Sequence, residues 1–323
     1  MSDERAFDIV GLGLATMDIL TVVPHLPGPD DVYAVHDIVL QGGGPAATAL
    51  VAASRLGATT SYVGVIGAGR WGRATRDEFE RYGVDTSQAR FSTEGDQSLS
   101  VILVDESSGR RSILYRPGNL PALAAEEVPA SLIQRARALH LDGVYPAAAR
   151  RAAEIAREAG VTVSFDGGAG EKWPGIEEIL PLVDLLVVAR DFAQRYTGYD
   201  EPLQAGPALL KAYGPQQVVI TDGERGAWFW DEEHYGNRRL HQPAFTVDVV
   251  DTTGAGDVFH GAYIYAYLQE WSPRRCLAFA SATAALKCRR IGGRAGIPTR
   301  DEVEQFVAQA LAPDNEEESN DSN

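Results

Sequence analysis

Cysteine, lysine and long apolar runs are all scarce in this chain of 323 residues. The two cysteines, Cys276 and Cys288, have no partners at a metal-ligand spacing, so neither a disulfide framework nor a structural zinc site is expected. The six histidines are scattered, which argues against a histidine-based triad. No stretch approaches the ~20 apolar residues of a membrane span, and the first residues lack the apolar core of a signal peptide. These absences predict a reduced, cytoplasmic protein without a membrane partner.

Positive charge is also in short supply, because 29 basic residues face 45 acidic ones and the formal net charge is −16. This charge opposes capture by nucleic acid or anionic lipid, so an anionic ligand must be held by a local pocket. Lysine accounts for only three of the basic residues and carries no functional signal in the sequence. The last residues, 313–323, are acidic and lack apolar anchors, which predicts a disordered tail after a folded domain over 1–312.

Strand and helix patterns alternate over most of the chain. Short apolar runs predict buried strands at 7–11, 161–165, 182–188 and 217–221. Helical patterns, several of them ended by glycine, occupy 45–56, 71–82, 147–159, 256–270 and 273–287. The alternation predicts one α/β unit with a central, mostly parallel sheet, helices on both faces, and ligands at the carboxyl ends of the strands.

Two stretches depart from this alternation, at about 19–42 and 97–116. The first has β-branched residues interrupted by prolines, and the second has two alternating runs around the turn 105–109. Both patterns suit exposed strands better than buried βα units. They predict a small β-sheet lid inserted into the main domain.

The most informative segment is Asp251-Thr-Thr-Gly-Ala-Gly-Asp257, which leads directly into a helical pattern. Its small residues predict a turn whose N–H groups, from Gly254, Ala255 and Gly256, converge beside the positive end of that helix. A phosphate would be held there, and Asp257 would accept the proton of a hydroxyl that attacks it. A lone Gly-x-Gly-Asp is more often an ordinary capped turn, but the seven-residue string is far more specific.

Two parts of the sequence resemble the signatures of the ribokinase-like carbohydrate kinases, also called the phosphofructokinase B type. Residues 42–49 (Gly-Gly-Gly-Pro-Ala-Ala-Thr-Ala) are similar to the N-terminal Gly-Gly signature, and residues 251–257 to the C-terminal one. The resemblance runs from about Asp8 to about Pro298, and in the C-terminal third, over 241–251 and 284–298, it is closest to the sulfofructose kinase branch. It implies a ribokinase-like fold with a β lid, and an ATP-dependent kinase that uses Mg²⁺ and phosphorylates a hydroxyl of a sugar or sugar derivative.

The resemblance also implies the catalytic roles. Asp257 would be the general base, and Gly254, Ala255 and Gly256 would donate N–H groups to the developing negative charge. A carboxylate at a helix N-terminus is expected to stay ionised at neutral pH, which makes it a weak base. A weak base suffices if the proton leaves late in a loose transition state.

Four residues are predicted to bind the substrate: Asp18, Gly42, Gly43 and Arg116. Asp18 matches the family position that hydrogen-bonds sugar hydroxyls, and the glycine pair lets the backbone approach the substrate closely. Arg116 would pair with an anionic group of the substrate. The alternatives are a simple turn cap for Asp18 and a solvated surface side chain for Arg116. Ala47 stands where the family often has Asn, which removes or replaces one hydroxyl contact.

Nucleotide binding is predicted for a second turn. The residues Thr221, Gly223 and Gly226 follow a strand and resemble the family's Thr-x-Gly-x-x-Gly phosphate turn. Gly254 and Gly256 of the first turn would also contact the nucleotide phosphates. A plain β-turn is the alternative reading of the second turn.

Metal binding is less clearly marked. The family's Asn-x-x-Glu motif, which orders water around the metal, is replaced by Ala-Arg-Asp-Phe at 189–192, so Asp191 or Asp166 is the candidate for positioning Mg²⁺. Asp251 and Thr253 resemble the site where relatives bind a monovalent cation such as K⁺.

Two other functions compete with the sugar kinase. One is a nucleoside kinase of the same fold, and the other is a catalytically silent sugar or nucleotide sensor. Retention of Asp257 with its complete turn argues against the sensor, because a binding module needs no base. Relatives often dimerise through the lid, and the alternating apolar residues of this lid predict a homodimer: Tyr33, Val35, Ile38, Val101, Leu103, Ile113 and Tyr115.

Overall fold

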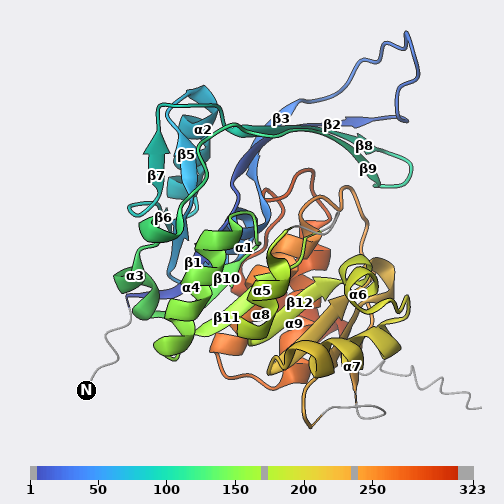
Figure 1. Cartoon of the computed structure of the whole chain (residues 1–323). Helices are drawn as coiled ribbons and strands as arrows, with labels where there is room; N and C mark the ends of the chain where they lie inside the picture. Colours follow the sequence, from blue (N-terminus) through green and yellow to red (C-terminus); the bar gives the residue numbers. More distant parts are fainter. Residues whose placement is uncertain (1–5, 169–173, 234–238, 312–323) are drawn as a thin grey trace, which may run out of the picture.

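The computed structural model describes residues 6–168, 174–233 and 239–311 (Figure 1). The predicted acidic tail, 313–323, lies outside the described residues. Within them the chain forms a large sheet with helices on both faces and a smaller sheet at one end (Figure 1).

The large sheet has nine strands in the order β15-β14-β13-β12-β11-β10-β1-β4-β6. Neighbours from β13 to β6 pair in parallel, and only β14 runs in the opposite direction, pairing antiparallel with both β13 and β15. The prediction of a central, mostly parallel sheet is therefore confirmed. The bounds are β1 Phe7–Leu12, β4 Thr60–Val63, β6 Val84–Asp85, β10 Ala136–Leu141, β11 Thr162–Asp166, β12 Leu185–Ala189, β13 Gln217–Thr221, β14 Ala227–Trp230 and β15 Leu240–Gln242.

Two hydrophobic cores form because successive strand residues point to opposite faces of the sheet. In β1, Ile9 joins one core, whereas Val10 and Leu12 join the other. The first core is completed by α1 Pro45–Arg55, α2 Arg70–Arg81, α8 Ala255–Leu268, α9 Pro273–Lys287 and α10 Arg300–Ala310. The second is completed by α3 Ala130–Gln134, α4 Pro146–Glu158, α5 Ile176–Ile179, α6 Arg190–Thr197 and α7 Pro202–Tyr213.

The smaller sheet has the strand order β3-β2-β8-β9. Its strands are β2 Thr16–Val23, β3 Val39–Gly43, β8 Ser98–Asp105 and β9 Arg111–Arg116. Because β1 runs directly into β2, this sheet lies beyond the carboxyl ends of the parallel strands (Figure 1). β2 starts earlier than the sequence pattern indicated, so Asp18 lies inside a strand and not in a turn. A separate pair, β5 Val65–Gly67 with β7 Arg90–Ser92, was not anticipated.

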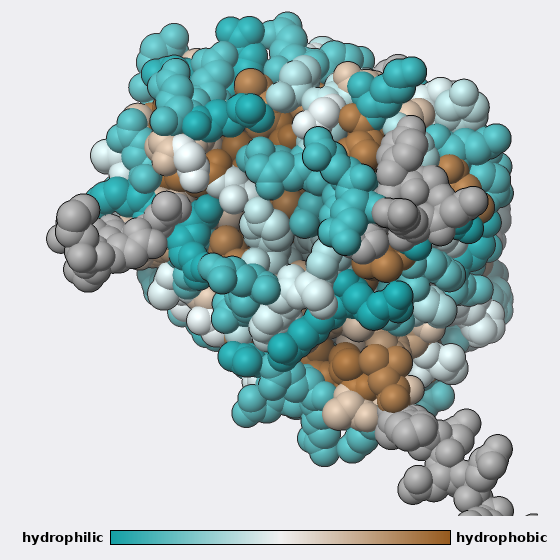
Figure 2. Space-filling view, turned by 90° about the horizontal axis from the view of Figure 1, so that it is seen from below, coloured by the Kyte–Doolittle hydropathy of each residue, from teal (hydrophilic) through white to brown (hydrophobic). Residues whose placement is uncertain are grey.

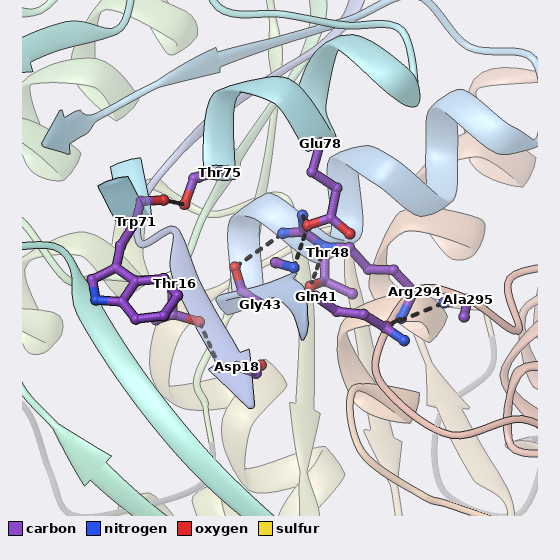
Figure 3. Close-up of polar contacts among 11 residues, drawn as sticks. Thr16, Asp18, Gln41, Gly43, Thr48, Trp71, Thr75, Glu78, Arg294 and Ala295 are labelled. Atoms are coloured by element: carbon purple, nitrogen blue, oxygen red, sulfur yellow. Dashed lines mark hydrogen bonds and ion pairs between the residues drawn. The ribbon is translucent and has the colours of Figure 1, made fainter. Parts of the chain in front are cut away.

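The loop after α9 is fixed to the small sheet by a buried arginine. The side chain of Arg294 is fully buried, and its Nη1 donates to Glu78 Oε2 of α2 at 3.1 Å. Its Nη2 donates to the carbonyl of Gly43 at 2.9 Å and its Nε to Thr48 Oγ1 at 3.3 Å (Figure 3). Glu78 also accepts the N–H of Gly42. The ion pair and the hydrogen bonds of its two side chains thus join β3, α1, α2 and the C-terminal loop.

Gln41 makes a second connection beside the first. Its Oε1 accepts the N–H groups of Arg294 and Ala295 at 3.2 and 3.3 Å, and its Nε2 donates to the carbonyl of Ile291 at 3.3 Å. A Cβ on Gly292 would lie 2.4 Å from the Gln41 amide, so only glycine fits there. The loop 291–295 is therefore held against β3 by side chains on both partners (Figure 3).

Breaking the buried ion pair on one side should be costly. Glu78→Met leaves the Arg294 guanidinium buried without its counter-charge, and we expect the free energy of unfolding to fall by about 3–5 kcal/mol. The double variant Glu78→Met with Arg294→Met removes both charges and should recover most of this loss. Urea unfolding measures both quantities. Glu178→Met, at the exposed ion pair with Arg150 (2.8 Å), is the control and should change stability little. A Glu78→Met protein as stable as the parent would contradict this account.

Candidate active site

The predicted phosphate turn is the start of α8. Gly254 is the N-cap residue and has a left-handed backbone with φ of 71°. Its Cα side faces the C-terminal loop, and an added Cβ would lie 3.0 Å from Gly293 Cα. Because glycine has no side chain, the helix N-terminus has no side-chain cap, which leaves its positive end to an anion. The N–H of Ala255 already donates to the carbonyl of Thr252 at 3.2 Å, and Gly256 is exposed.

Asp251 holds this turn in shape. Its Oδ1 accepts the N–H of Thr253 at 2.8 Å and the Thr253 hydroxyl at 2.7 Å. Its Oδ2 accepts the N–H of Gly292 at 2.7 Å, and its carbonyl accepts Lys287 Nζ at 2.9 Å. Asp251 is fully buried, so these bonds replace the water that its carboxylate loses. The turn is thereby tied to both α9 and the C-terminal loop.

The environment of Asp257 differs from the sequence expectation. Burial, together with the negative charges of Asp166 and Asp18, raises the pKa of the partly exposed Asp257 carboxyl to about 7. The positive charges of Arg111 and Arg294 act in the opposite direction but do not offset this rise. The prediction that the helix N-terminus keeps Asp257 ionised was wrong, because desolvation and like charges outweigh a dipole effect of this size.

Asp166 ends β11 and lies beside Asp257. Burial raises its pKa to about 6, although its Oδ1 accepts the N–H of Gly168 at 2.7 Å. His260 Nε2 lies 3.4 Å from the same oxygen. Burial lowers the pKa of His260 to about 3, so the imidazole is neutral and does not compensate the carboxylates. Two negative groups therefore meet at the phosphate turn without a cationic histidine.

His140 of β10 completes a cluster with these two residues. One ligand atom each from His140, Asp166 and His260 lies within 4.8 Å of the others, and all three side chains are buried. Their donor types are those that a divalent transition metal accepts. Within the described part of the chain, His140 Nε2 and His260 Nδ1 have no hydrogen-bond partner. Sequence reasoning missed this cluster because its members come from three separate elements.

Asp18 forms the opposite side of the site. It is buried on β2, accepts the Thr16 hydroxyl at 3.1 Å and the Ser100 hydroxyl, and has a pKa raised chiefly by burial (Figure 3). An added Cβ on Gly43 would lie 2.1 Å from Asp18 Oδ2, and one on Gly42 would lie 2.2 Å from both Arg294 and Glu78. The glycine pair is thus enclosed between Asp18 and the buried ion pair, and the structure brings the two sequence signatures together.

The two arginines of β9 have different surroundings. Arg116 is half-exposed, lies 3.5 Å from an Asp96 oxygen and donates to the carbonyl of Gln97 at 2.9 Å. Arg111, at the other end of the strand, donates from Nη1 to Thr252 Oγ1 at 3.1 Å. Sequence reasoning named Arg116 and missed Arg111. The small sheet therefore contributes a positive charge directly to the phosphate turn.

The second predicted turn lies at the end of β13. Thr221 is the last residue of this strand, and Gly223 and Gly226 in the turn have φ of 49° and 90°. A Cβ on Gly226 would lie 2.0 Å from the carbonyl of Gln242, whereas Gly223 has open space around it. The guanidinium of Arg225, between them, is paired with two carboxylates: its Nη1 lies 3.1 Å from Glu201 Oε2, and its Nε donates to Asp222 Oδ2 at 2.5 Å.

The segment that replaces the Asn-x-x-Glu motif lies next to this turn. Arg190 Nε is 3.6 Å from Asp222 Oδ1 and 3.9 Å from Asp191 Oδ1. Asp191 is largely exposed, whereas Asp166 is buried beside Asp257. The negative charge of Asp166 raises the pKa of Asp257, and carboxylate oxygens are the ligands that a hard divalent cation prefers. Of the two candidates, Asp166 is the one that lies beside Asp257.

None of the helices in the described ranges has the length and apolar character that a membrane crossing requires.

Comparison with known proteins agrees with this geometry. Residues 6–300 match the model of the pfkB family carbohydrate kinases. An ATP-dependent ribose-1-phosphate kinase of Halopiger xanaduensis is 31% identical over 303 residues, which cover 93% of this chain and 98% of that protein. A nucleoside kinase of Methanothermobacter thermautotrophicus is 28% identical and covers 96% of this chain and 98% of its own length.

Solved structures show the same fold. A putative ribokinase from Agrobacterium tumefaciens superposes with a TM-score of 0.85 at 27% identity, covering 94% of this chain and 98% of that one. A putative ribokinase II from E. coli in complex with ATP and Mg²⁺ has a TM-score of 0.80 at 21% identity, with 94% and 99% covered. A family match over nearly the whole chain, with both signatures bound to the same C-terminal loop, shows that this protein belongs to the pfkB family of carbohydrate kinases.

Proposed function

We propose that this protein transfers the γ-phosphoryl group of ATP to a hydroxyl of a sugar or sugar derivative, with Asp257 as the general base. The observation that carries the proposal is the meeting of Asp257 and Asp18 beside an uncapped helix N-terminus. Asp18 would orient the acceptor hydroxyls, and the backbone of Gly42 and Gly43 would form the surface against which the sugar lies.

Proton transfer suits the environment of Asp257. With its pKa raised to about 7, Asp257 is a stronger base than an ordinary aspartate and is still partly ionised at neutral pH. The positive end of α8 and the N–H groups of Gly254 and Gly256 would stabilise the charge on the migrating phosphoryl group, whereas the predicted donor Ala255 already binds the carbonyl of Thr252. Arg111 would add a full positive charge from the small sheet.

The nucleotide would bind across the two turns. Gly223 has open space around it and follows Thr221 at the end of β13, which supports nucleotide phosphate binding there, whereas Gly226 is enclosed by the carbonyl of Gln242. Asp166 would hold Mg²⁺, which neutralises the nucleotide phosphates when bound. Arg116 stays a candidate for an anionic group of the substrate, beside Asp96.

Removing the proposed base should stop turnover and leave binding intact. Asp257→Asn keeps the size of the side chain but cannot accept the proton, so we expect kcat to fall about 10²–10⁴-fold. ATP affinity, measured by calorimetry, should stay unchanged. Glu178→Gln alters an exposed carboxylate of α5 that has no proposed role in the reaction, and it serves as the control. If Asp257→Asn turned over at the parent rate, Asp257 would not be the base.

The rate should depend on pH in a direction set by the pocket. Because the base must be ionised, kcat/KM should decline as the pH falls below about 7. Asp166→Asn removes a negative neighbour and lowers the pKa of Asp257, so the acid limb should move to lower pH. Burial persists in this variant, which keeps that pKa above the ordinary value. A pH–rate profile of both proteins tests the shift, and an acid limb at the same pH in both would contradict it.

The nucleoside kinase and the silent sensor stay as alternatives. A panel of neutral sugars, sugar phosphates, a sulfonated sugar, adenosine and inosine, with coupled detection of ADP, separates them. Phosphorylation of sugars or their derivatives supports the leading proposal. Exclusive use of nucleosides favours the nucleoside kinase, and binding without ADP formation favours the sensor.

A homodimer through the small sheet is the corresponding assembly proposal. The sheet and its flanking loop expose large apolar side chains, namely Val32, Ile38, Leu40, Ile113, Leu114 and Tyr115. The opposite face of the molecule is mainly hydrophilic, with apolar residues in separate patches (Figure 2). Sedimentation at micromolar concentration should show a dimer, and Leu114→Glu should shift it to monomer. A parent protein that sediments only as monomer would contradict this assembly.

We also propose a cytoplasmic location, which the buried, free thiols of Cys276 and Cys288 support.

A further inference from the structure

A fully buried lysine lies under the phosphate turn. Lys287 is the last residue of α9, and its Nζ donates to the carbonyl of Asp251 at 2.9 Å. Among the described residues, no carboxylate oxygen is within 4 Å of this ammonium group. Burial lowers the pKa of Lys287 below its ordinary value, and the negative charges of Asp251 and Asp257 act in the opposite direction from farther away. Lys287 is therefore a buried cation whose direct partner is a backbone oxygen.

Burying a lysine in this way lowers the stability of the fold, which indicates that the positive charge has a function. Moving an ammonium group out of water is unfavourable, and lysine is rarely fully buried without a paired acid. An apolar side chain of similar length would fill the same space in the helix packing without this cost. The charge binds the first residue of the turn that leads to Asp257, which indicates that it acts on the shape of this turn.

The oxygens around Asp251 are already engaged by protein donors. Thr253 and Gly292 donate to its two carboxylate oxygens, and Lys287 donates to its carbonyl. A bound K⁺ ion needs several such oxygens free to face it. The ammonium group is about the size of K⁺ and already occupies the carbonyl oxygen of Asp251, so this oxygen is not free for an ion. The site thus does not fit the monovalent cation predicted for Asp251 and Thr253.

We propose that the ammonium group of Lys287 is a built-in monovalent cation that holds the phosphate turn and makes this protein independent of free K⁺. Lys287 acts as a positioning residue, because it reaches the reacting groups only through Asp251. The turn runs from Asp251 to Gly254, where it packs on Gly293 and starts α8. The inference rests on the proposed kinase function only for its rate measurements.

The first test needs no variant. In the parent protein, kcat and the unfolding midpoint should be the same in KCl, NaCl and choline chloride at equal ionic strength. A saturable stimulation by K⁺, or a midpoint that rises specifically with K⁺, would overturn the proposal.

Two substitutions then separate the charge from the space it occupies. Lys287→Ala removes the charge and leaves room for an ion, whereas Lys287→Met removes the charge and fills the space. Both should lower kcat on the order of 10²-fold in choline chloride, the loss that a 1 Å displacement of a reacting group can cause. NH₄⁺ or K⁺ should restore much of the rate in Lys287→Ala and little in Lys287→Met. Lys211→Met, on the exposed face of α7, is the control.

A readout that does not depend on activity accompanies these rates. NH₄⁺ and K⁺ should raise the unfolding midpoint of Lys287→Ala and leave the midpoints of the parent and of Lys287→Met unchanged. Full turnover of Lys287→Ala in choline chloride, or equal behaviour of the two variants toward K⁺, would contradict the proposal. If Lys287→Ala fails to fold, the parent titration and Lys287→Arg, which keeps the charge and should stay K⁺-independent, still decide it. A parent protein that phosphorylates no acceptor in any salt would refute the kinase function instead, and the midpoints would still test the cation.

Discussion

The concentration of negative charge around a helix N-terminus is the constraint on which the rest of the site depends. Asp18, Asp166 and Asp257 come from β2, β11 and α8. The negative charges of Asp18 and Asp166 raise the pKa of Asp257. In a chain with a net charge of −16, such a pocket would repel phosphate unless positive groups were placed inside it. The uncapped end of α8, Arg111 and Lys287 supply that positive potential locally.

The segment from Lys287 to Ala295 connects the two halves of the site. At one end, Lys287 holds the carbonyl of Asp251, and Gly292 donates to its carboxylate. At the other end, Arg294 holds the carbonyl of Gly43 and pairs with Glu78. The phosphate turn and the glycine pair are far apart in sequence, yet both are fixed to the same short loop. Their separation therefore depends on the loop, which explains why its contacts are buried and numerous.

Much of the fold was predictable, because the patterns that specify it are local. α9 has the bounds that its alanine-rich pattern indicated, 273–287, and the ends of α1, α4 and β13 differ from prediction by a residue at most. The region 19–40 was predicted less well: β2 begins at Thr16, and no strand forms over 24–38 of the described chain. Alternation shows that a strand exists, but its start depends on pairing with β8, which starts at Ser98 and pairs with β2 from Thr16 on.

The sequence alone determined the family signatures and the α/β alternation, since each rests on residues close together in the chain. Only the tertiary structure decided the electrostatics. Asp257 has a raised pKa because the fold buries it and brings the negative charges of Asp166 and Asp18, both remote in sequence, close to it. Likewise Arg111, Lys287 and Arg294 look like ordinary basic residues until the fold places them at the two turns. Proximity of charges across elements has no local sequence pattern, because it arises only when the strands and helices pack.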